Sequence, residues 1–132
     1  MAERGAAATG GRPAIIHHLA LAAEYAATPA GQPYLPAAYA ADGFIHCTLE
    51  PDVLLVVANR FYQGAPGEFV VLDVDPARLA AEVRYEAGQP PAPEGSVLAG
   101  VLFPHIYGPI NCEAVVAVRQ ARRAPDGRFL EV

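Results

Sequence analysis

The side chains best suited to chemistry in this sequence are its four histidines, each of which interrupts an apolar run. They lie in three segments, at residues 15–19, 44–47 and 103–107. An imidazole in an apolar strand or loop loses its hydration, so it needs a hydrogen-bond partner or a functional role. A single buried histidine can have the structural role of donating a hydrogen bond to a backbone carbonyl. This structural role is a less favoured explanation for all four histidines together. The pattern predicts that some of them share a site.

Several common kinds of active site are excluded by residues that the sequence lacks. The 132 residues include no lysine, which excludes a Schiff base, a lysine general base and a P-loop lysine. Ser96 is the single serine and lies outside any nucleophile-elbow motif, and there is no GxGxxG. Cys47 and Cys112 form no CxxC pair and are interpreted as free thiols. Any chemistry therefore depends on histidine, carboxylate, tyrosine, arginine or cysteine.

Length and charge favour a small cytoplasmic domain. No apolar run approaches the roughly 20 residues of a membrane span, and the first residues lack the pattern of a signal peptide. We expect a disordered leader at residues 1–12 and a single domain at residues 13–132. The formal net charge of −5 argues against a nucleic-acid partner, although four arginines gather near the C-terminus. The sequence leaves the oligomeric state open.

Hydrophobic periodicity predicts about six strands and two or three helices. Strands are expected at residues 13–19, 44–47, 68–74, 82–86, 114–119 and 129–132, with a brief one at 34–35. Helices are expected at 20–27 and from an N-cap at Thr48 to about Tyr62. The class is α+β, with a mostly antiparallel, split or barrel-like sheet. Residues 88–100 are rich in proline and glycine and form either a lid that covers a site or a long loop without a function. We favour the lid.

Strand alternation decides which histidines can share a pocket. His17 and His18 are adjacent and must point to opposite faces, so only one of them can face a given pocket. His46 should share a face with Phe44 and point away from Cys47. We also expect loss of hydration to keep at least one histidine neutral at pH 7, even beside a carboxylate.

A metal site made of histidine and cysteine side chains is a minor alternative. His46, His105, Cys47 and Cys112 are suitable ligand types, but their spacing matches no recognised metal motif. No metal is therefore predicted.

Four segments resemble, in order and spacing, the bacterial family known as domain of unknown function 952: residues 42–48, 69–76, 85–86 and 103–110. The resemblance covers residues 13–118. It implies a small relative of the ADP-ribosyltransferase superfold, similar to the RNA 2′-phosphotransferases, whose sites use histidines on two early strands. The two histidines implied are His18 and His46, while His17 stands where the family more often has an aromatic residue.

Glu86, His105 and Tyr107 match the family's remaining polar positions, to which the resemblance assigns no role. We expect His18, His46, Glu86 and His105 to be catalytic. We expect a second set to bind the substrate: Thr48, Phe103, Tyr107, Arg84 and Tyr34. Neutral imidazoles can hold the ribose and amide of NAD by hydrogen bonds, and Glu86 can stabilise positive charge on the reacting sugar. NAD is thus a possible substrate.

Three functions remain in competition. The first is an ADP-ribosyltransferase-like enzyme acting on NAD or another nucleotide. The second is a small-molecule cyclase, isomerase or hydrolase with histidine as general acid and base, since a fold does not determine a chemistry. The third is a non-catalytic ligand-binding module. A small molecule fits better than RNA because the net charge is negative and Arg84 is the only arginine close to a matching motif.

Overall fold

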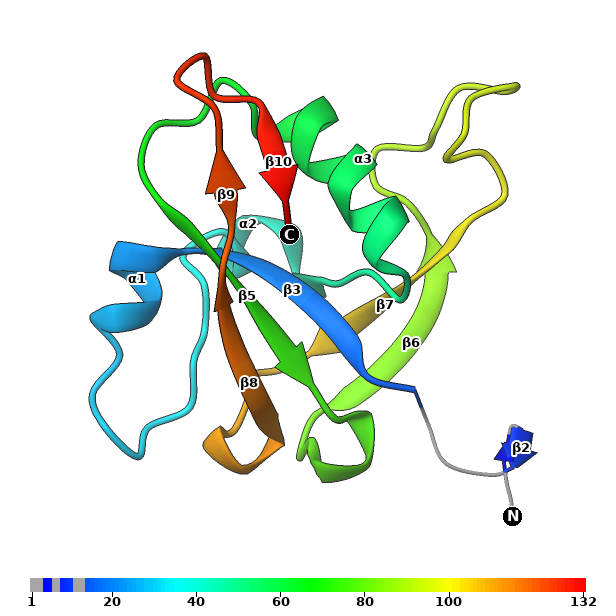
Figure 1. The fold of residues 1–132 in the computed structure, drawn as a ribbon. Helices are drawn as coiled ribbons and strands as arrows, with labels where there is room; N and C mark the ends of the chain where they lie inside the picture. Colours follow the sequence, from blue (N-terminus) through cyan, green and yellow to red (C-terminus); the bar gives the residue numbers. More distant parts are fainter. Residues whose placement is uncertain (1–3, 6–7, 11–13) are drawn as a thin grey trace.

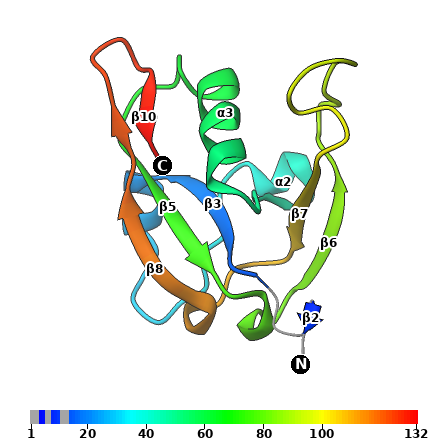
Figure 2. The same ribbon diagram turned by 45° about the vertical axis from the view of Figure 1, so that its right-hand side comes forward.

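Two three-stranded antiparallel sheets form the framework of the protein in a computed structural model, which describes residues 4–5, 8–10 and 14–132. The first sheet has the order β3 (Ile16–Leu21), β5 (Phe69–Val74), β8 (Val115–Gln120). The second has the order β4 (Ile45–His46), β7 (Leu102–Tyr107), β6 (Glu82–Ala87). Figures 1 and 2 show them as two open layers. The predicted antiparallel α+β class is confirmed, and the sheets of the described residues are split and open.

Shorter elements complete the description. Strand β9 (Arg122–Arg123) was not expected, and it pairs with β10 (Phe129–Glu131). Strand β1 (Arg4–Gly5) pairs with β2 (Ala8–Gly10), and both lie in the segment that we expected to be a disordered leader. The other residues of that segment, and residue 13, where the first strand was expected to start, lie outside the described residues. Single 3-10 turns are η1 (Pro76–Arg78) and η2 (Cys112–Ala114). The boundary between leader and domain stays a prediction.

Three helices differ in how well the sequence predicted them. Helix α1 (Ala22–Ala26) is shorter than expected because β3 continues to Leu21, which pairs with Phe69. Helix α2 (Tyr39–Asp42) was not expected, and it ends at Gly43, whose φ of 82° is a left-handed conformation that glycine adopts freely. Within residues 4–5, 8–10 and 14–132, no helix is long and apolar enough to cross a membrane. The cytoplasmic location stays a prediction.

Helix α3 (Pro51–Phe61) corrects the expected N-cap. Glu50, not Thr48, is the N-cap residue. The backbone N–H of Thr48 donates to the His17 carbonyl and the His17 N–H donates to the Thr48 carbonyl, both at 2.8 Å. This reciprocal bridge keeps Thr48 extended, so the helix begins only at Pro51, three residues after Thr48. A proline at this position needs no hydrogen-bond acceptor. The same bridge joins the first sheet to the second.

The core has two parts, one on each face of the first sheet. Between the two sheets lies a cluster that includes Ile16, Leu72 and Ile106. On the opposite face, Leu19 and Val71 belong to a second cluster that includes residues of α3 and β10. Strand β5 is therefore central and buried on both faces, as its continuous apolar run predicts.

His18 occupies the core between the sheets. It is 7% exposed, its Nδ1 lies 2.7 Å from the carbonyl oxygen of His46, and its ring lies beside Tyr34. Burial lowers the pKa of His18 from its ordinary value of 6.5 to about 4, outweighing the raising effect of that carbonyl. The ring is therefore neutral at pH 7, as expected for at least one histidine, and Nδ1–H is the donor.

We predict that His18 makes the protein sensitive to acid. The unfolded chain gains a proton on this ring near pH 6.5, whereas the folded chain does so near pH 4. Stability therefore falls as the pH drops through this window, by about 2–3 kcal/mol between pH 7.5 and 4.5. His18→Asn keeps a donor near the Nδ1 position and should remove this part of the pH dependence of the free energy of unfolding, measured by urea denaturation.

The control is Ile16→Val, a packing change on the same face of β3. It should lower stability by a similar amount at both pH values. An unchanged slope with pH in His18→Asn would contradict the prediction.

Candidate functional site

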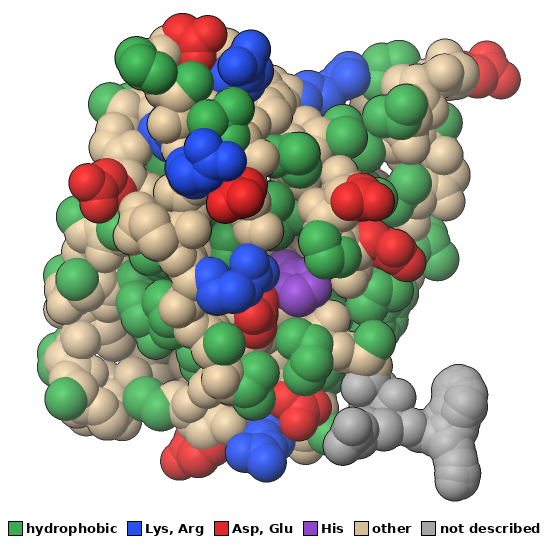
Figure 3. Space-filling view, in the orientation of Figure 1, with side chains coloured by type: hydrophobic (Ala, Val, Ile, Leu, Met, Phe, Trp, Pro, Cys, Tyr) green, Lys and Arg blue, Asp and Glu red, His purple; other side chains and the backbone are tan. Residues whose placement is uncertain are grey.

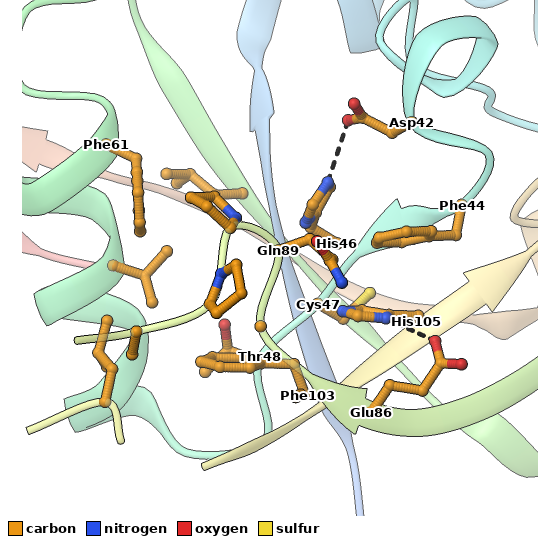
Figure 4. A pocket seen from close by; sticks show the side chains of 18 of the residues that line it. Asp42, Phe44, His46, Cys47, Thr48, Phe61, Glu86, Gln89, Phe103 and His105 are labelled. Atoms are coloured by element: carbon orange, nitrogen blue, oxygen red, sulfur yellow. Dashed lines mark hydrogen bonds and ion pairs between the residues drawn. The ribbon is translucent and has the colours of Figure 1, made fainter. Parts of the chain in front are cut away.

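A cavity of about 870 Å³ lies between the second sheet, helix α3 and the segment after β6. Its volume is within the range of roughly 300–1,000 Å³ that small-molecule sites occupy. Residues 88–92 and Leu98 line it, so the segment expected to be a lid does form one of its walls. Figure 4 shows the cavity with its polar side chains gathered at one end.

The structure brings together most of the expected site residues, but not all. Six line the cavity: His46, Thr48, Glu86, Phe103, His105 and Tyr107. Three do not: His18, Tyr34 and Arg84. The prediction that His18 lines this pocket is therefore wrong. His18 faces the core between the sheets together with Tyr34, and the β3 residue that reaches the cavity is Leu19, on the opposite face.

His17 faces away from His18, as strand alternation predicts, and lies outside the cavity. Its Nδ1 lies 2.7 Å from Asp73, which also accepts two hydrogen bonds from Arg119. This trio lies across the three strands of the first sheet. His17 therefore takes part in a hydrogen-bonded network with a carboxylate and an arginine.

His105 is the most constrained side chain of the cavity. Its side chain is 2% exposed, and its Nδ1 lies 2.8 Å from Oε1 of Glu86. The hydroxyl of Tyr107 donates to the same oxygen at 2.6 Å, and the ring of Phe44 stacks on the imidazole at 4.0 Å. The carboxylate can only accept, so the proton resides on Nδ1 and Nε2 carries a lone pair. In Figure 4 this second nitrogen faces the cavity, away from Glu86.

The register of β6 against β7 explains this arrangement. Arg84 pairs directly with His105, and Glu86 pairs with Phe103, so Glu86 is the diagonal neighbour of His105 on one face of the sheet. Arg84 lies on the same face, over the ring of Tyr107 at 4.5 Å, and forms an ion pair with Glu82. Arg84 therefore borders the cavity without lining it.

Burial and pairing oppose each other at His105, and burial prevails. Loss of hydration lowers the pKa of His105, while the hydrogen bond that it donates to Glu86 raises this pKa and the charge of His46 lowers it. Hydrogen bonds from Tyr107 and then from His105 lower the pKa of Glu86. At neutral pH the pair is an ionised carboxylate beside a neutral imidazole, which is the state of a general base awaiting a proton.

A second carboxylate–histidine pair lies at the same end of the cavity. Nε2 of His46 is 3.0 Å from Oδ2 of Asp42, and the rings of His46 and His105 lie 5.7 Å apart. Asp42 is the last residue of α2, and the turn at Gly43 brings it back over His46, four residues later. The segment at residues 42–48 contains both residues, but Asp42 was not among the predicted site residues. Its spacing from His46 was the signal that could have found this pair.

Three further side chains complete the polar end. Thr48 is 4% exposed, and its hydroxyl points into the cavity in Figure 4. Cys47 is buried, and burial raises the pKa of its thiol far above the usual range, so it stays protonated. Gln89, from the segment after β6, lies near His46 and His105 in Figure 4 and was not predicted as a site residue. Figure 4 also shows Phe61 of α3, another unpredicted residue, on the opposite wall.

The minor alternative of a metal site finds no support in the part of the chain that the structure describes. No three His, Cys, Asp or Glu side chains there form a group that could hold a metal ion. Cys112 lies outside the cavity, where its sulfur donates to the carbonyl of Gln32.

The arginines near the C-terminus are largely occupied within the protein. Arg119 and Arg122 form ion pairs, and Arg123 donates to backbone carbonyls, including that of Gly67. On the face shown in Figure 3, acidic and basic side chains are interspersed and form no continuous basic surface. This distribution does not favour a nucleic-acid partner on that face.

The comparisons with known proteins place the chain in a family. Residues 19–118 match the family described as "Protein of unknown function (DUF952)", and the chain belongs to it. The chain is similar to the X-ray crystal structure of protein CC0527 from Caulobacter crescentus, with 26% identity, a TM-score of 0.68, and 87% of this chain and 92% of that chain covered. A double-methionine variant of CC0527 gives 25% identity and the same TM-score. No curated protein matches.

We predict that Glu86 holds the pKa of His105 up against the effect of burial. Glu86→Gln removes the negative charge, so the midpoint of the His105 titration should fall further below 6.5. The measurement is a ¹H–¹³C NMR titration of the histidine ring signals, assigned by substitution. Asp73→Asn, which removes the carboxylate beside His17, should leave His105 unchanged. A rise in the His105 midpoint in Glu86→Gln would contradict the prediction.

Proposed function

We propose that this protein is a small-molecule enzyme that uses histidines as general acid and base. The observation that supports this most is the His105–Glu86–Tyr107 network. It leaves one nitrogen of a buried, neutral imidazole directed into a cavity, while a carboxylate holds the other. A carboxylate in this position orients the ring and stabilises the imidazolium that forms when the ring takes a proton.

In this proposal the two histidines divide the proton transfers. Nε2 of His105 removes a proton from the substrate, forming an N–H bond as the substrate's bond to hydrogen breaks, and the carboxylate of Glu86 stabilises the positive charge of the resulting imidazolium. His46, held by Asp42, returns a proton to another atom of the substrate. The ring separation of 5.7 Å allows one substrate group to lie against both imidazoles. Isomerisation, cyclisation and hydrolysis all need such a pair of transfers.

Covalent catalysis is less well supported than proton transfer. The Cys47 thiol is kept protonated by burial, and a thiol is a far weaker nucleophile than a thiolate. For Thr48, no hydrogen bond joins its side chain to a histidine among the described residues. The histidines themselves are therefore the groups on which the proposal rests.

The test uses His105→Asn with His17→Asn as a matched control. Each variant keeps a donor for its carboxylate, Glu86 or Asp73, and each loses the second ring nitrogen. Purified proteins are incubated with a bacterial small-molecule extract, and mass spectrometry follows the ions that are consumed or formed. The wild type and His17→Asn should convert the same compound. His105→Asn should be at least about 100-fold slower, the usual loss for a general base.

Equal conversion by His105→Asn and the wild type would exclude His105 as the base. Conversion lost equally in both variants would point to a loss of folding. Circular dichroism and thermal unfolding of the three proteins separate these cases.

ADP-ribosyl transfer from NAD is a second candidate. The observation that favours it is an ionised Glu86 in a cavity of nucleotide-sized volume, where a carboxylate can stabilise positive charge on a dissociating sugar. Phe44 and Phe103 offer rings against which a base can stack, and Arg60 is a cation that can meet a phosphate. In this candidate function NAD is the substrate, and the protein is a transferase that acts on a nucleotide.

For this candidate we predict saturable binding of NAD and ADP-ribose in isothermal titration calorimetry. Arg60→Gln should weaken the binding of ADP-ribose by about tenfold or more, since a hydrogen bond to a charged group contributes about 1.5–3 kcal/mol. Arg78→Gln, at an arginine outside the cavity, is the control and should bind as the wild type does. Absence of binding at millimolar concentrations of both ligands would contradict the NAD candidate and leave the acid–base enzyme as the proposed function.

A further inference from the structure

The cavity has one polar end and one apolar wall. The carboxylate–histidine pairs occupy the first. Apolar side chains from α3 and from the segment after β6 line the second: Leu54, Val57, Phe61, Pro90, Pro91 and Leu98. In Figure 4, Phe61 lies across the cavity from His46 and His105. A ligand that fills this space must therefore present two different chemistries at its two ends.

The apolar wall continues the buried stripe of α3 into the cavity. Leu54, Val57 and Phe61 recur at the three- and four-residue spacing of one helix face. Leu54 is 2% exposed, but Phe61, at the end of the helix, is 47% exposed. The stripe thus begins in the core and ends uncovered at the cavity, where an apolar ligand would complete its burial.

The charges at the polar end restrict the other end of the ligand. Asp42 and Glu86 both line this end, and the pKa of Glu86 is lowered. Arg60 also lines the cavity, but it lies on α3 beside Phe61, on the apolar wall. An anionic head group placed at the histidines would meet the carboxylates of Asp42 and Glu86, which is unfavourable in a partly buried site, while Arg60, the one arginine among the described residues that line the cavity, lies on the other wall.

We propose that the substrate is an amphipathic organic molecule with an uncharged polar head and an apolar tail. The head, which carries the transferable proton, lies between His46 and His105. The tail lies along α3, against Val57, Phe61 and Leu98. This inference rests on the proposed function for the role of the head, while the tail-binding wall is a separate feature of the cavity.

The experiment measures binding of butanamide, hexanamide and octanamide to the full chain by NMR titration. Each amide has the same neutral head, so the series varies only the tail. The dissociation constant should fall by up to about fourfold for each added methylene that becomes buried. Hexanoate, which has the same tail with a charged head, should bind at least about tenfold more weakly than hexanamide.

Two valines of α3 provide matched variants. Val57 lines the cavity, whereas its neighbour Val56 does not and is 37% exposed. Val57→Asp should weaken octanamide by about tenfold or more and abolish the dependence on tail length. Val56→Asp should bind the series as the wild type does.

The outcomes separate this inference from the proposed function. An affinity that does not depend on tail length, or an equal effect of Val57→Asp and Val56→Asp, would overturn the amphipathic substrate. This holds even if His105→Asn fails to convert a compound that the wild type converts. A steep dependence on tail length that persists in His105→Asn would support the tail site whether or not His105 is the base. Tighter binding of hexanoate than of hexanamide would overturn the assignment of a neutral head.

Discussion

The structure depends on the backbone bridge between His17 and Thr48. Two reciprocal hydrogen bonds of 2.8 Å join the edge of one sheet to the segment that follows β4, and the side chain of His18 adds a third contact, to the carbonyl of His46. Satisfying these backbone groups inside the protein is favourable because a buried unpaired group is costly. The bridge holds β4 in place, directs His46 into the cavity, and delays the start of α3 until Pro51.

Carboxylate–histidine pairing recurs three times with different consequences. His17 with Asp73 lies on the first sheet outside the cavity, His46 with Asp42 lies at the cavity's partly exposed end, and His105 is almost fully buried beside Glu86. The contacts are similar in length, so the pairing alone does not distinguish them. What distinguishes His105 is burial together with a second nitrogen that faces open space, the combination that suits a base.

The family and the solved relative leave the chemistry to be argued from the site itself. The matching family carries the description of unknown function, and CC0527 shares the fold at 26% identity. The likeness to ADP-ribosyltransferases rested in part on a histidine of the first strand within the site. Because His18 lies in the core with its pKa near 4, that part of the resemblance does not describe this cavity.

The sequence by itself determined most of the strands, though not β7 or β9, and it determined which strand is central in the first sheet and which side chains alternate on each. The run at residues 69–72 predicted a strand buried on both faces, and the alternation around His46 predicted that it shares a face with Phe44, whose ring lies 4.6 Å away. These properties follow from local periodicity, which each segment carries alone. Six of the nine expected site residues line one cavity because they share faces of β4, β6 and β7 or, like Thr48, follow β4 closely.

Only the tertiary structure decided which face of each strand met the cavity. Alternation shows that His17 and His18 point apart, but it contains no information on which sheet β3 joins. Pairing with β5 turned His18 toward the core and Leu19 toward the cavity. The Asp42–His46 pair and the apolar wall of α3 likewise depend on a turn and a helix placement set by contacts far apart in the chain. Such contacts are long-range, and no local pattern of residues specifies them.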